Sequence, residues 1–240
     1  MFIIYLFLFS NLAFSQLYES YSILDSIVNK LSPPTSKSII TQVNTSPFKK
    51  DRLFKYEYFV DNIEGVKLIK YIFPQKVKNN SFLIKNNGKD IWGYFNKSQT
   101  TRKLGSHVMK QGIQNSDFTF EDLGKNNNWL TNYKIDLKKE KNDFIIHLHI
   151  IDKKKSDYDK IIIYANVETL YPSKIIYIKD NINEKTLFLD DILQKNNFLY
   201  AQTMIMKNIL TKTETKMIID EIEFDVFFDN DIFNENRLQK

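Results

Sequence analysis

Cysteine is absent from this chain of 240 residues, which also contains only 6 glycines and 3 histidines. Without cysteine, neither a disulfide framework nor an acylated cysteine can form, so the fold depends on its own hydrophobic core. The composition permits such a core, because 42% of the residues are hydrophobic and 14% are aromatic. A chain of this length and composition is expected to form one domain of ordinary size.

Motifs of the common enzyme and nucleotide-binding classes are also missing. The sequence has no G-x-S-x-G elbow, no G-x-x-x-x-G-K-[ST] phosphate loop and no G-x-G-x-x-G fingerprint. His147 and His149 have a spacing that can bind a metal, but a histidine pair on a strand is more often a satisfied or solvated surface. Ser106-His107 and Ser116-Asp117 have no supporting order or geometry as parts of a catalytic triad. We therefore predict a protein that is not an enzyme, with no catalytic residue, no metal and no cofactor.

Arginine is scarce although the chain is basic, with a net charge of +5 and a pI near 9.0. Only Arg52, Arg102 and Arg237 carry the guanidinium group, which recognises phosphates and base edges best. The many lysines accompany an excess of Asn, Ile, Phe and Tyr, which indicates a general compositional bias. We therefore predict no nucleic-acid partner, and a weak attraction to anionic membrane surfaces stays open.

The first residues form a short apolar run from Phe2 to Phe9, followed by Ala13-Phe14-Ser15 before Gln16. Small residues at these positions are typical of a signal-peptidase site, and the run is too short to cross a bilayer as a helix. We predict a secretory signal over residues 1–15, cleaved after Ser15, and a single domain over residues 16–240. A retained anchor is the alternative, because the usual positive n-region is missing.

Hydrophobic periodicity predicts one helix and then a long series of strands. Apolar residues at helical spacing begin near Leu17, and Pro33-Pro34 end the helix. From there the period is two, as in strands joined by short polar turns. The expected strands cover residues 36–45, 52–61, 65–73, 81–85, 90–95, 129–140, 144–151, 160–168, 173–179, 186–189, 201–213 and 216–228. About a dozen antiparallel strands with few helices predict a mainly β fold, a strongly curved sheet or barrel.

Residues 104–123, LGSHVMKQGIQNSDFTFEDL, are the longest stretch with neither strand nor helix periodicity. Long structured loops are usually functional. Asn115 tolerates the left-handed backbone region, and Asp117 is expected to accept hydrogen bonds from amides that open a helical turn. Phe118 and Phe120 have rings that need cover. The stretch is therefore either a capped loop attached to the core by two phenylalanines or the functional site.

The segment NSDFTFEDL, residues 115–123, resembles the GSDFSYEDL-type signature of the LolA-like outer-membrane lipoprotein-sorting proteins. The resemblance extends to Trp92 and Tyr94 with Arg102, Lys103 and Leu104, to Pro74 and Lys76, and to the closing residues Asp231, Ile232, Phe233 and Leu238. Asn115 replaces the usual glycine and preserves its access to positive φ. The proline expected near Asn96 and Lys97 is missing, which puts the end of that strand in doubt.

This resemblance implies an incompletely closed, LolA/LolB-like half-barrel whose open side is covered by helices. It further implies a monomeric periplasmic carrier that shields the acyl chains of lipoproteins or another lipid in a hydrophobic cavity. Inner- and outer-membrane handover proteins would be its partners. The residues expected to bind the lipid are Phe54, Tyr56, Tyr58, Trp92, Tyr94, Phe118 and Phe120.

Three alternatives to this interpretation stay open. The same aromatic residues could simply form the core. The fold could serve as a non-enzymatic adaptor of a membrane transporter, without a cargo. A small-molecule binder or hydrolase is the third possibility.

Overall fold

The structure, a computed structural model, describes residues 18–124, 128–229 and 231–239. The predicted signal segment, residues 1–15, lies outside the described residues. The first described element is a helix over residues 18–31, and Pro33 and Pro34 follow its end. Leu24, Ile27 and Val28 are almost fully buried, as their helical spacing predicts.

Thirteen strands form a single antiparallel sheet in the order β6-β5-β4-β3-β2-β1-β13-β12-β11-β10-β9-β8-β7. Nearly every strand pairs with its neighbours in the sequence, so the sheet is a meander except where β1 meets β13. The strands are β1 Thr35–Ser46, β2 Lys49–Asp61, β3 Val66–Phe73, β4 Ser81–Lys85, β5 Asp90–Phe95, β6 Thr100–Leu104, β7 Tyr133–Glu140, β8 Asp143–Ile150, β9 Lys160–Asn166, β10 Pro172–Lys179, β11 Ile182–Lys195, β12 Phe198–Asn208 and β13 Thr213–Phe224.

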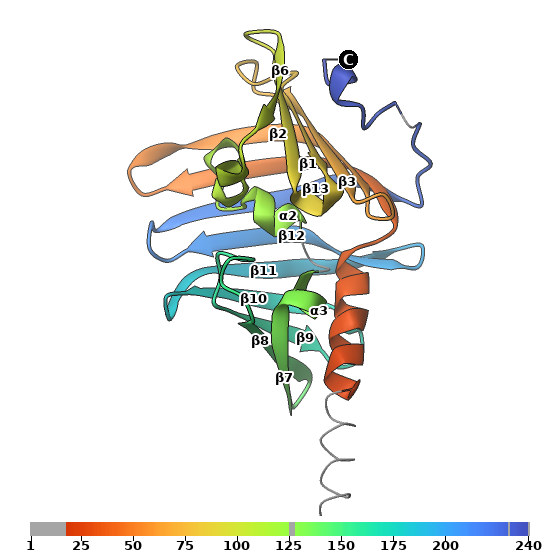
Figure 1. The fold of residues 1–240 in the computed structure, drawn as a ribbon, viewed down its shortest axis with the longest axis vertical. Coiled ribbons are helices and arrows are strands. Elements are labelled where there is room, and N and C mark those ends of the chain that lie inside the picture. The colour runs from red at the N-terminus through yellow and green to blue at the C-terminus, as the bar shows by residue number, and fades with distance from the viewer. Residues whose placement is uncertain (1–17, 125–127, 230, 240) are drawn as a thin grey trace, which may run out of the picture.

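The sheet curves but does not close. Within the part of the chain that the structure describes, β6 and β7 each pair on one side only. Figure 1 shows the helix over residues 18–31 together with α2 (Phe120–Gly124) and α3 (Trp129–Asn132) on the same side of the sheet. The predicted mainly β, incompletely closed antiparallel barrel with a few covering helices is confirmed.

Several element boundaries differ from the sequence prediction. The largest difference is β11, which extends over Ile182–Lys195 where a strand over residues 186–189 was expected, because residues 190–195 are exposed and show no hydrophobic alternation. Strand β6 was not expected, because this edge strand has no buried residue and therefore no hydrophobic alternation. The strand expected over residues 129–140 begins with α3, whose Trp129 is buried in the core. Strand β13 ends at Phe224 and not at residue 228, because Asp225 has a φ of 57° and the backbone leaves the extended region there.

Apolar residues are buried on both faces of the sheet. The main core lies between the concave face and the helices, and a second, smaller cluster lies on the opposite, convex face. In this second cluster Phe59, Leu68 and Leu83 contact the C-terminal segment, of which Leu238 is only 1% exposed. The Ser81 hydroxyl donates to the Leu238 carbonyl at 3.1 Å and fastens this segment to β4. The C-terminal residues therefore cover β2–β5 from outside and leave the concave face free.

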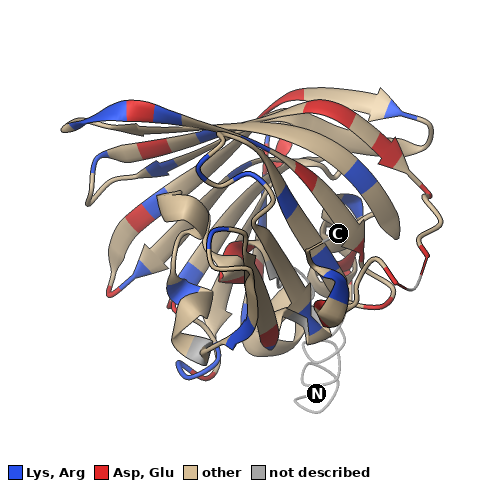
Figure 2. Ribbon diagram, turned by 90° about the horizontal axis from the view of Figure 1, so that it is seen from above, with Lys and Arg blue, Asp and Glu red and all other residues tan. Residues whose placement is uncertain are grey.

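Charged residues are distributed over the whole molecule. Figure 2 shows lysine and arginine interspersed with aspartate and glutamate along the strands and turns. Many of them form cross-strand or turn ion pairs, such as Lys55 with Asp220 at 2.9 Å. The positive net charge is therefore not gathered into one basic face.

Candidate functional site

The loop that follows β6 crosses the concave side of the sheet. It passes through two short 3-10 turns, η2 (Ser106–Lys110) and η3 (Ile113–Asn115), and enters α2. Gln114 and Asn115 have φ values of 54° and 56°, so Asn115 does adopt the left-handed conformation. Gly112 is also required, because a Cβ at this position would lie 1.8 Å from the Ser116 carbonyl oxygen. The loop therefore has one defined shape.

The first turn of α2 is capped by Thr119 and not by Asp117. The Thr119 amide donates to Asp122 Oδ2 at 2.7 Å, and the Asp122 amide donates to Thr119 Oγ1 at 3.2 Å. This reciprocal pair is a capping box. The prediction that Asp117 caps the turn is wrong, since its carboxylate accepts hydrogen bonds from the hydroxyls of Thr213 and Thr215 on β13 at 2.6 and 2.9 Å. Asp117 thus fastens the loop to the sheet.

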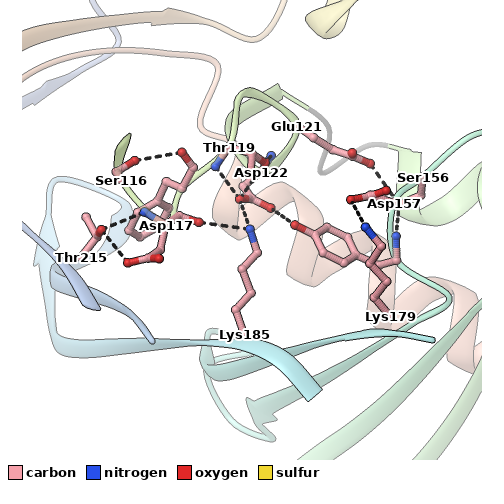
Figure 3. Close-up of polar contacts among 12 residues, drawn as sticks. Ser116, Asp117, Thr119, Glu121, Asp122, Ser156, Asp157, Lys179, Lys185 and Thr215 are labelled. Atoms are coloured by element: carbon pink, nitrogen blue, oxygen red, sulfur yellow. Dashed lines mark hydrogen bonds and ion pairs between the residues drawn. The ribbon is translucent and has the colours of Figure 1, made fainter. Parts of the chain in front are cut away.

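A buried ion pair lies beneath this loop (Figure 3). Lys185 Nζ lies 2.5 Å from Asp122 Oδ2 and also donates to the Asp117 carbonyl at 3.1 Å. Both side chains of the pair are only 3% exposed. The ammonium lies 5.2 and 5.4 Å from the ring centroids of Tyr158 and Tyr177. The second Asp122 oxygen accepts a hydrogen bond from the Tyr158 hydroxyl at 3.1 Å.

The tyrosines of this cluster are neutral, and Tyr158 is a hydrogen-bond donor to Asp122. Burial, and after it the Asp122 charge, raises the pKa of Tyr158 and of Tyr177 well above the usual value for tyrosine. Two further contacts extend the cluster to the loop after β8: Glu121 accepts from the Ser156 hydroxyl at 3.0 Å, and Lys179 donates to Asp157 at 2.8 Å. The loop over residues 104–123, the signature loop, is thus held by the Lys185 ammonium on β11 and by hydroxyl groups on β13 and on the loop after β8.

Beside this loop the concave face encloses a cavity of about 210 Å³. The end of the helix over residues 18–31, the loop and α3 cover it, and strands β1–β3 and β10–β13 form its floor. The apolar side chains of its wall come mainly from the second half of the sheet. They include Ile175, Leu187, Leu189, Leu199, Met204, Met206, Ile219, Ile222 and Phe224.

Two lysines also line the cavity. Lys67 on β3 is half-buried, and its ammonium donates to the Leu123 carbonyl near the end of α2. Burial lowers the pKa of Lys67 to about 8. Lys30, at the end of the first helix, is exposed at the rim. The cavity is therefore apolar on one side and cationic on the other.

The structure separates the aromatic residues predicted from the sequence into three groups. Tyr58 and Phe118 line the cavity. Phe54, Tyr56 and Phe120 belong to the core beside it, where Tyr56 and Phe54 pack on Tyr71 and Phe120 packs on Phe82. Trp92 and Tyr94 belong to the convex cluster, because Ile91 and not its neighbours faces the concave side of β5. Ligand contact by Tyr58 and Phe118 stays a prediction.

The two histidines of β8 alternate with buried residues. Ile146 and Leu148 are fully buried, so His147 and His149 face the other side, with their ring centroids 6.4 Å apart. Within the described residues, no group of three or more His, Asp or Glu side chains is placed to hold a metal ion.

Sequence reasoning missed the lysines of the site. Lys185 precedes Leu187 and Leu189 at intervals of two, and Lys67 precedes Ile69 and Tyr71 in the same way. All six side chains belong to the concave face. The available signal was a lysine two residues before a buried residue of the same strand. Attributing all lysines to compositional bias left this signal unused.

The architecture defines a half-barrel: a curved sheet with two free edges that encloses an apolar cavity under short helices. Residues 65–240 match a family model described as "-like: Uncharacterized protein", and the chain belongs to that family. No curated protein matches the chain.

Several solved structures share this fold over nearly the whole chain. A domain described as an outer membrane lipoprotein-sorting protein from Vibrio parahaemolyticus is 19% identical with a TM-score of 0.80, and the match covers 93% of this chain and 100% of that one. A DUF1329 family protein from Desulfovibrio piger is 17% identical with a TM-score of 0.82, covering 93% and 99% of the two chains. A LolA superfamily protein from Nitrosomonas europaea is 14% identical with a TM-score of 0.73, covering 90% and 98%. The resemblance to LolA-like proteins is confirmed at the level of the fold.

None of the helices in the described residues is long and apolar enough to span a bilayer.

Proposed function

We propose that this protein is a non-enzymatic periplasmic carrier that shields the acyl chain of a lipid or lipoprotein in its concave cavity. The observation that supports this proposal best is the cavity of about 210 Å³, lined by leucine, isoleucine and methionine. A natural core is packed so closely that voids larger than a water molecule are few. A hollow of this size on the concave face therefore supports a site for an apolar ligand.

The size of the cavity limits how tightly it holds a chain. Small-molecule sites usually occupy about 300–1,000 Å³, so this cavity covers part of a long acyl chain unless it widens. Each covered CH₂ group contributes about 0.8 kcal/mol before the cost of association is subtracted, so a partly covered chain is held with moderate affinity. Such affinity suits a carrier, because a protein that held its cargo much more tightly could not release it.

The helix over residues 18–31 is the part of the cover best suited to move. It contacts the core mainly through apolar side chains such as Leu24 and Ile27, and the Tyr21 hydroxyl donates to the Leu130 carbonyl of α3, which is itself part of the cover. The loop over residues 104–123, in contrast, is tied to the sheet through Asp117 and through the buried Asp122–Lys185 pair. We expect cargo to enter beside the helix while the loop keeps its position.

The test is to purify the full chain from the periplasm of its host and to measure bound lipid by native mass spectrometry and extraction. Met204→Trp places a large ring at the cavity wall. The control Ile209→Trp makes the same kind of change outside the cavity, at a residue that is 51% exposed. We expect acyl chains at close to one per protein in the wild type and in Ile209→Trp, and a large loss in Met204→Trp. An empty wild-type protein that takes up no lipid from vesicles would contradict the proposal. An empty protein that co-purifies with a membrane protein would favour the adaptor alternative.

A further inference from the structure

We infer that the natural cargo is an amphiphile with an anionic oxygen head group, a carboxylate or a phosphate, which pairs with Lys67 while its chain occupies the apolar side of the cavity. This inference rests on the proposed function, since it assigns a chemical class to the ligand of the same cavity. It is carried by the asymmetry of the cavity wall and by the unbalanced charge within it.

The polar and apolar parts of the wall come from different parts of the sheet. Strands β1–β3 and the turn after β2 contribute Ser36, Ser38, Asn62 and Lys67 beside the apolar Ile40 and Val60. Strands β11–β13 contribute Leu187, Leu189, Met204, Met206, Ile219 and Ile222. A cavity for a purely apolar ligand needs no such division, whereas a ligand with a head and a tail matches it.

The charges in the wall do not cancel. The charged side chains that line the cavity are Lys30, Lys67 and Asp122, and Asp122 is already neutralised by Lys185. Among the residues that the structure describes, no carboxylate forms an ion pair with Lys67, whose ammonium is satisfied by the Leu123 carbonyl. The cavity therefore presents an ammonium group without a counterion, and a cargo that carries an anion would supply one.

The protonation of the surrounding groups favours such a pair. Burial is the cause of the lowered pKa of Lys67, and an anion within about 4–6 Å would reverse that effect and favour the charged form. Apart from Lys30 at the rim and the Asp122 carboxylate paired with Lys185, the titratable groups that face the cavity are tyrosines, including Tyr58, Tyr171 and Tyr177. Burial raises the pKa of each of them, so they are neutral and do not repel an anion.

The test compares ligands that differ only in the head group. Isothermal titration calorimetry of the full chain would use decanoate, decyl phosphate and 1-decanol as probes, with acetate as the head group without a chain. The variants are Lys67→Met and, as a matched control, Lys207→Met, which makes the same change at a lysine whose side chain is 54% exposed on β12.

We expect the wild type and Lys207→Met to bind at least one anionic probe about 10- to 100-fold more tightly than decanol, the range of a charge-assisted hydrogen bond. In Lys67→Met this preference disappears while decanol binding is kept. Near pH 8, binding of the anion to the wild type is accompanied by uptake of a proton, which is visible as a dependence of the measured heat on the buffer. The better of decanoate and decyl phosphate identifies the head group.

The unfavourable results are distinct from one another. Equal binding of decanol and both anions to the wild type overturns the head-group inference but leaves the carrier proposal intact. An equal loss of all probes in Lys67→Met shows that Lys67 merely fastens α2 to β3, and it also overturns the inference. Binding of acetate as strongly as decanoate overturns it as well, since the chain would then play no part. Failure of every amphiphile to bind contradicts the carrier proposal itself.

Discussion

Lys185→Met tests whether the signature loop depends on the buried ion pair. The substitution keeps an unbranched side chain one atom shorter and removes the charge, so Asp122 keeps its hydrogen bonds from Thr119 and Tyr158 but loses its counterion. With both partners only 3% exposed, a carboxylate left alone in this position costs about 3–5 kcal/mol. This is a large part of the 5–15 kcal/mol by which a typical domain is stable. For a domain of this size we expect the melting temperature to fall by about 6–20 °C.

Urea unfolding followed by fluorescence and circular dichroism measures this loss. Lys207→Met is again the control, because the Lys207–Glu214 pair is 54% and 38% exposed and its removal should cost several times less. The double variant Asp122→Leu, Lys185→Met should regain most of the stability, less the contribution of the capping box. The explanation is refuted if Lys185→Met loses no more stability than the control. It is also refuted if the double variant is as unstable as Lys185→Met alone, since the loss would then come from packing and not from an isolated charge.

Three further predictions concern the loop and the cavity. Gly112→Ala should destabilise the protein by several kcal/mol or shift the loop, because the new Cβ meets backbone at 1.8 Å. In the control Gly105→Ala the nearest contact is the His107 ring at 2.8 Å, which can turn away. Equal melting temperatures for the two variants would contradict the clash. Thr215→Val removes a hydroxyl that donates to the Asp117 carboxylate, and it should lower the free energy of unfolding in urea by about 1.5–3 kcal/mol. A loss below about 0.5 kcal/mol, the size of a neutral surface change, would show that the hydrogen bond is not formed in solution. The pKa of Lys67 is about 8 in the folded protein and higher in the unfolded chain, so the unfolded chain binds more protons between these two pKa values. The free energy of unfolding of the wild type should therefore rise relative to that of Lys67→Met between about pH 8 and pH 10. A constant difference between the two free energies would refute this.

The strands could be predicted because most of them show regular alternation. Residues 54, 56, 58 and 60 of β2 share one face in the sequence pattern, and Phe54 and Tyr56 are indeed buried on the concave side. The limits of β4 and β5 were also predicted correctly. The residue pattern alone could not show that β1 pairs with β13, because that contact joins parts of the chain far apart in sequence and depends on the curvature of the whole sheet.

The site itself was only partly accessible from the sequence. The loop was located through its composition, yet its chemistry depends on Lys185, which lies 63 residues from Asp122 along the chain. Which aromatic rings face a cavity was also beyond the sequence. Trp92 and Tyr94 are aromatic residues two positions apart, as Tyr56 and Tyr58 are, but they belong to the cluster covered by the C-terminal segment. Only the fold determines which face of each strand is the hollow one.

The junction of β1 with β13 has a consequence for how the protein reaches its native state. Val43 pairs with Lys216 and Ser36 with Phe224, so the middle of the sheet joins the first strand to the last. Strands β1–β6 and strands β7–β12 can each form from contacts between neighbouring strands. The pairing of β1 with β13, which joins the two halves, can form only after β13 has been synthesised. Loss of the last strand would therefore split the molecule through its centre and open the cavity floor.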